Sequence, residues 1–146
     1  MVEGNALRTG LGSSVAGAGD VDGDGFLELI LGAPEYNTGR GRLLLFRGSS
    51  SGPGAAPAWS IDNPLDYGEL GRSVASAGDV DGDGYADVLV GAPLLLLRGA
   101  ALVYRGSPAG LPTTPDWYFF GETDMGFGGE GFGHAVASAG DVNGDG

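Results

Sequence analysis

A segment of about sixty residues occurs twice in this chain of 146 residues and begins a third time. The three copies open at Leu11, Leu70 and Phe132, which are 59 and 62 residues apart, and each is followed by glycine and then by an Ala-Gly-Asp sequence. Later landmarks keep the same phase, among them an Arg-Gly-Ser sequence and a tryptophan in each full copy. A fixed period of this length marks a repeat architecture, so we expect one structural unit to be used several times.

Each unit has the pattern of four short strands separated by Gly, Pro, Ser and Asp. No window of useful length shows helical periodicity. The expected strands cover roughly residues 12–18, 27–32, 42–47 and 58–62 in the first unit, and roughly 71–77, 86–91, 100–105 and 116–120 in the second. A four-stranded antiparallel unit at a fixed period predicts an all-β fold made of β-propeller blades.

This interpretation divides the chain into four parts: a lead-in at 1–10, a first blade at 11–69, a second blade at 70–128 and the start of a third at 129–146. Propellers close with typically ~4 to 8 blades, so two blades leave apolar faces uncovered. We therefore expect either the remainder of a longer propeller or other copies of the chain to cover them.

Composition excludes several classes of protein. Seven basic residues, all Arg, stand against 19 acidic ones, for a net charge of -12, so no basic stripe exists to bind nucleic acid. No apolar run approaches the ~20 residues of a membrane helix, and the first residues do not resemble a signal peptide, so membrane insertion is not expected. With no Cys, the chain has neither disulfides nor a thiol-based metal or redox site.

An acidic loop follows the first strand of each unit, with Asp at positions 1, 3 and 5 and Gly at position 6. Carboxylates at positions 1, 3, 5 and 9 and a backbone carbonyl at 7 can surround one Ca²⁺ with oxygens at ~2.3 to 2.6 Å, while the glycine permits the tight turn. The predicted ligands are Asp20, Asp22, Asp24, Phe26 (carbonyl) and Glu28 in the first loop, Asp79, Asp81, Asp83, Tyr85 (carbonyl) and Asp87 in the second, and Asp141, Asn143 and Asp145 in an incomplete third.

The acidic loops have three alternative interpretations: an EF-hand, metal-free turns and a transition-metal site. An EF-hand requires Glu at position 12, where this chain has Leu31 and Val90, and it requires flanking helices. Solvated Asp-Gly turns without a metal remain possible from the sequence alone. Transition metals are disfavoured because the loops contain neither Cys nor His.

The Leu-Gly or Phe-Gly opening, the Asp-x-Asp-x-Asp-Gly loop and the Gly-Ala-Pro sequences at 32–34 and 91–93 resemble the FG-GAP repeat of integrin α-subunit amino-terminal propellers and of many bacterial secreted proteins. The resemblance implies a seven-bladed propeller with calcium in some hairpin loops. It also implies an extracellular or periplasmic location and a role in adhesion, with a protein or glycan as ligand.

No nucleophile and base are plausibly paired in this sequence, so we expect no enzymatic activity. Two alternatives are the non-catalytic propeller of a larger secreted lyase or lipase and a self-assembling, lectin-like oligomer of short chains. Trp59 and Trp117 recur in phase, which predicts a structural anchor in the outer strand of each blade. The four leucines at 94–97 predict a contact surface.

Overall fold

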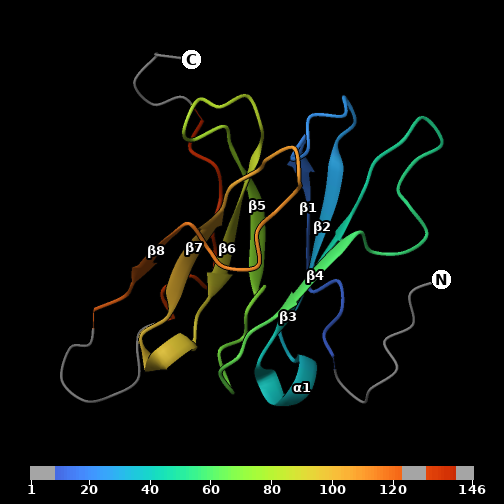
Figure 1. Ribbon diagram of the computed structural model, residues 1–146. Coiled ribbons are helices and arrows are strands. Elements are labelled where there is room, and N and C mark those ends of the chain that lie inside the picture. The colour runs from blue at the N-terminus through green and yellow to red at the C-terminus, as the bar shows by residue number, and fades with distance from the viewer. Residues whose placement is uncertain (1–8, 123–130, 141–146) are drawn as a thin grey trace.

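The computed structural model describes residues 9–122 and 131–140, which form two four-stranded antiparallel sheets (Figure 1). In each sheet the strands follow one another in chain order. The first sheet contains β1 (Ser14–Gly19), β2 (Glu28–Ala33), β3 (Arg42–Phe46) and β4 (Trp59–Asp62); the second contains β5 (Ser73–Gly78), β6 (Asp87–Ala92), β7 (Ala100–Tyr104) and β8 (Trp117–Phe120). The predicted all-β fold with blade-like sheets is confirmed, and in the described part of the chain the sheets do not close into a ring.

The connections between the second and third strands contain the only helical turns among the described residues, α1 (Tyr36–Gly39) and the 3-10 turn η1 (Leu95–Leu97). Both are interrupted by left-handed residues, Asn37 and Thr38 in α1 and Leu96 in η1. In the described residues, these short turns agree with the absence of helical periodicity from the sequence. Among the described residues, no helix has the length and apolar character needed to cross a membrane.

The core lies between the two sheets, whose first strands β1 and β5 run side by side (Figure 1). Ile30 and Leu43 of the first sheet and Val88 and Val90 of the second are fully buried. Burial of such side chains from both sheets in one cluster is the main favourable contribution to their packing. The two sheets therefore share one core.

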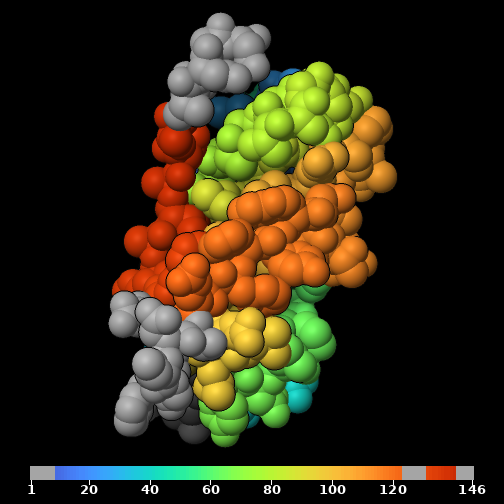
Figure 2. All heavy atoms as spheres, turned by 90° about the vertical axis from the view of Figure 1, so that its left-hand side faces the viewer, coloured from blue at the N-terminus to red at the C-terminus, as the bar shows by residue number. Residues whose placement is uncertain are grey.

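The outer strands β4 and β8 differ in how far they are covered. Trp59 packs edge-on against Tyr104 of the second sheet, with ring centroids 5.8 Å apart, as expected of a structural anchor. The equivalent Trp117 is 49% exposed and stacks on Phe119 of its own strand. Figure 2 views the side of the molecule on which residues 105–122 (orange) and 131–140 (red) lie at the surface. The aromatic side chains of β8 thus have no third sheet over them in the described residues.

The described residues 131–140, which belong to the predicted start of the third blade, form no strand in the structure. In the first two units, the first strand pairs with a second strand of the same unit, β1 with β2 and β5 with β6. Among the described residues, no second strand pairs with this segment. The blade boundaries at 69/70 and 128/129 remain predictions.

Candidate metal centre

The first two acidic loops each connect the first two strands of their sheet, at the upper end of the molecule in Figure 1. The hairpin brings three carboxylates of each loop together, so that their ligand oxygens lie within 4.8 Å of one another. These residues are Asp20, Asp22 and Glu28 in the first loop and Asp79, Asp81 and Asp87 in the second. They occupy positions 1, 3 and 9 of the predicted ligand set.

The position-1 aspartate organises the turn. Oδ1 of Asp20 accepts hydrogen bonds from the backbone N–H groups of Gly23 and Asp24 at 2.8 and 3.1 Å, and Oδ2 accepts one from Gly25 at 3.0 Å. Asp79 repeats this pattern in the second loop. These backbone donors, chiefly that of Gly84, lower the pKa of Asp79, so this carboxylate keeps its negative charge.

The glycine at position 6 has the left-handed conformation that the sequence led us to expect. Gly25 has φ of +89° and Gly84 has φ of +93°. A side chain would be strained there. The glycine thereby lets the loop turn back towards the second strand.

The position-5 aspartates are held by local bonds instead of joining the carboxylate cluster. Oδ1 of Asp24 accepts a hydrogen bond from the backbone N–H of Phe26 at 2.9 Å, and Asp83 accepts one from Tyr85 at 3.0 Å. The structure therefore brings together three of the four predicted carboxylates in each loop. The third loop, with Asp141, Asn143 and Asp145, lies outside the described residues.

The position-9 carboxylate is buried at the start of the second strand. Glu28 is 1% exposed and Asp87 is 0% exposed. Each accepts two backbone hydrogen bonds: Glu28 from Val21 at 2.9 Å and Gly48 at 3.3 Å, and Asp87 from its counterparts in the second unit, Val80 at 2.8 Å and Gly106 at 2.9 Å. Burial raises the pKa of both carboxyl groups, the backbone donors partly offset this, and neighbouring loop aspartates raise it further.

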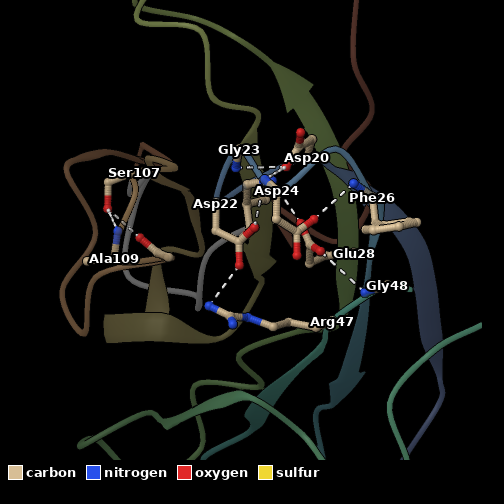
Figure 3. A network of polar contacts seen from close by, with 12 residues as sticks. Asp20, Asp22, Gly23, Asp24, Phe26, Glu28, Arg47, Gly48, Ser107 and Ala109 are labelled. Atoms are coloured by element: carbon tan, nitrogen blue, oxygen red, sulfur yellow. Dashed lines mark hydrogen bonds and ion pairs between the residues drawn. The ribbon is translucent and has the colours of Figure 1, made fainter. Parts of the chain in front are cut away.

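An arginine that follows the third strand pairs with each of the two loops, and Figure 3 shows the pair in the first loop, between Arg47 and Asp22. Nη2 of Arg47 lies 2.8 Å from Oδ2 of Asp22, and Nη1 of Arg105 lies 2.9 Å from Oδ2 of Asp81. These arginines are not among the site residues predicted from the sequence. The recurrence of their Arg-Gly-Ser sequences at the same place in both units was the sequence signal that could have pointed to them. The arginine pairs with the aspartate at position 3, and the N–H of the next residue, Gly48 or Gly106, donates to the carboxylate at position 9.

The first loop also contacts loops of the second unit, whereas among the described residues no further unit covers the second loop in this way. The carbonyl oxygens of Asp20 and Val21 accept hydrogen bonds from the backbone N–H groups of Ala86, in the second loop, and Ser107, in the segment after β7, both at 2.9 Å. Val21 is 0% exposed, while the equivalent Val80 is 55% exposed. The first loop is consequently part of the junction between the two sheets.

Both loops offer the oxygen ligands that a hard cation prefers. Their side-chain donors are carboxylate oxygens, and a buried carboxylate in each faces two others at close range. Like charges at such distances repel unless a cation or proton lies among them. The residues present therefore fit Ca²⁺, with positions 1, 3 and 9 as the side chains that would hold it.

Comparison with known proteins agrees with this geometry. The profile of the FG-GAP-like repeat family matches residues 20–90, which include both loops and the first Gly-Ala-Pro sequence. This chain is an FG-GAP repeat protein. The FG-GAP chain is similar to human integrin alpha-IIb, at 37% identity over 74% of its residues, to Xenopus laevis integrin alpha-4, at 31% over 98%, and to Drosophila melanogaster integrin alpha-PS2, at 35% over 75%. It spans 10%, 14% and 9% of the length of these three relatives, respectively.

Proposed function

We propose that this FG-GAP chain is a calcium-stabilised propeller segment of an extracellular adhesion or ligand-binding module, and that it has no catalytic activity. The observation that carries the proposal is the buried carboxylate at position 9, which faces two further carboxylates in both units. The similarity to integrin alpha chains supports the adhesive role and the extracellular location.

Calcium in this proposal is architectural. A bound ion would join the end of β1 to the start of β2, and the end of β5 to the start of β6. It would also compensate the repulsion within each carboxylate cluster. Because Asp20 and Val21 contact the second sheet, an ion in the first loop would in addition hold the junction between the sheets.

Thermal unfolding with and without calcium tests this proposal. Binding to the folded state alone raises stability by mass action, so the Tm should rise with free calcium and fall on addition of a chelator. Asp81→Ala removes a position-3 ligand and should weaken the response, whereas Asp66→Ala removes an exposed acid away from both loops and should leave it unchanged. A Tm indifferent to calcium would refute the metal assignment.

The ligand-contact surface in this proposal includes the loops at the opposite end of the molecule from the metal loops. Leu94, Leu96 and Leu97 are exposed there, Leu97 to 71%. Leu95 instead packs against the core, so three of the four leucines are available for contact. The test is the double variant Leu96→Ser and Leu97→Ser, measured by the attachment of cells to the immobilised chain. Unchanged attachment would show that these two leucines are not part of the ligand-contact surface.

A further inference from the structure

We propose that Arg47 and Arg105 are built-in counter-charges of the two metal loops, which hold the loops together without the ion and weaken calcium binding when the ion enters. This inference rests on the proposed calcium function. It concerns which residues set the affinity of that site, beyond the carboxylates that form it.

The same arrangement occurs in both units. Each arginine follows the last residue of the third strand and pairs with the position-3 aspartate at 2.8 or 2.9 Å. The glycine that follows each arginine donates its N–H to the position-9 carboxylate. One Arg-Gly dipeptide therefore contacts two of the three clustered carboxylates, which an incidental surface pair would not repeat in both units.

Shielding of the aspartate distinguishes these pairs from ordinary surface ion pairs, which contribute little, whereas the side chains of Arg47 and Arg105 are 57% and 47% exposed. The side chain of Asp22 is only 5% exposed, and that of Asp81 is 24% exposed. Water is therefore a poor substitute for the guanidinium at Asp22 in the ion-free loop. The first loop should depend on its arginine more than the second does, because the second sheet covers the first loop.

The positive charge has opposite effects on the two states of the loop. Without calcium, it offsets repulsion among the carboxylates. With calcium, it repels the dication: charges of +1 and +2 about 6 Å apart in a water-like dielectric repel enough to weaken binding about tenfold. A guanidinium is a charged group with a planar set of donors, so this counter-charge belongs to the side chain itself.

Isothermal titration with calcium chloride tests the inference in chains that keep one complete loop. Asp81→Ala impairs the second loop, and in that background Arg47→Met should bind calcium about tenfold more tightly. Its Tm in chelator should fall, and the rise in Tm on adding calcium should become larger. Arg47→Lys retains the charge and should keep the affinity closer to that of the parent chain.

Arg40→Met is the matched control, because Arg40 pairs with Asp66 and not with either loop. It removes the same charge from the chain and should leave calcium affinity unchanged. If Arg47→Met fails to fold, Arg105→Met in an Asp22→Ala background is judged by the same criteria, with a smaller effect expected.

The outcomes separate the two proposals. Absence of calcium binding by the parent chain would refute the proposed function itself. Calcium binding by the parent, with unchanged or weaker binding after removal of the arginine, would leave the calcium site intact and overturn the counter-charge role. Tighter binding together with a lower Tm in chelator supports that role.

Discussion

The carbonyl oxygen of Gly71 occupies the space that a β-carbon on Gly32 would need, 1.9 Å from that position. Oγ of Ser14 donates a hydrogen bond to the same oxygen at 2.8 Å. Gly133 stands in the same relation to Gly91 in the second unit, at 1.8 Å. The glycine of Gly-Ala-Pro therefore contacts the second residue of the following unit, also a glycine, and this contact joins each unit to the next.

Gly32→Ala should destabilise the chain by at least about 3 kcal/mol, because the obstructing atom belongs to the backbone and cannot rotate away. Gly17→Ala is the matched control in the neighbouring strand, where a β-carbon meets nothing within 4 Å. Its effect should stay within about 1 kcal/mol, towards greater stability, since alanine reduces the freedom of the unfolded chain. Equal denaturation midpoints for the two variants would contradict this account of the contact.

The sequence predicted the eight strands because alternating apolar runs and Gly-rich turns recurred at one period. The sequence also predicted which loop positions carry the carboxylates, because all of them lie within nine consecutive residues of one hairpin. Arg47 and Gly48 escaped prediction as site residues, because they reach the loop only through the pairing of β2 with β3. The contact of Val21 with the second sheet was equally hidden, since both units have valine at that position.

Val21→Ala should lower the free energy of unfolding by about 2 kcal/mol, because Val21 is fully buried at the sheet junction. Val80→Ala makes the same chemical change at the equivalent, exposed position and should cost no more than about 0.5 kcal/mol. Urea denaturation of both variants measures the difference. A cost at Val80 equal to that at Val21 would mean that another surface covers Val80 in solution.

Leu95→Ala should destabilise the chain by about 1 to 2 kcal/mol, because the side chain packs against the core. Leu97→Ala should be nearly neutral, because Leu97 is exposed and a left-handed backbone with φ of +59° strains leucine and alanine alike. Thermal unfolding in the presence of calcium compares the two. A larger loss at Leu97 would place that leucine in the core and remove it from the proposed contact surface.

In chelator, the stability of the chain should rise as the pH falls from 7 towards the ordinary pKa values of Glu28 and Asp87, 4.5 and 3.8. Burial raises the pKa of both carboxyl groups in the folded state, so the folded chain binds protons before the unfolded chain does, and proton uptake favours folding in that window. The lowered pKa of Asp79 acts in the opposite sense, but only below its ordinary value of 3.8. Tm measurements between pH 4.5 and 7 therefore report on the two buried groups.

Acidification also reduces the general charge repulsion in a chain of net charge -12, which by itself can raise the Tm. The double variant Glu28→Gln and Asp87→Asn is the control for this effect. It keeps the other acids and lacks the two buried titrating groups, so its Tm in chelator should rise less on acidification than that of the parent. With saturating calcium the parent should show the reverse trend, because protons then compete with the ion for the same oxygens. Parallel pH profiles of parent and double variant in chelator would show that the position-9 carboxylates do not titrate as buried groups.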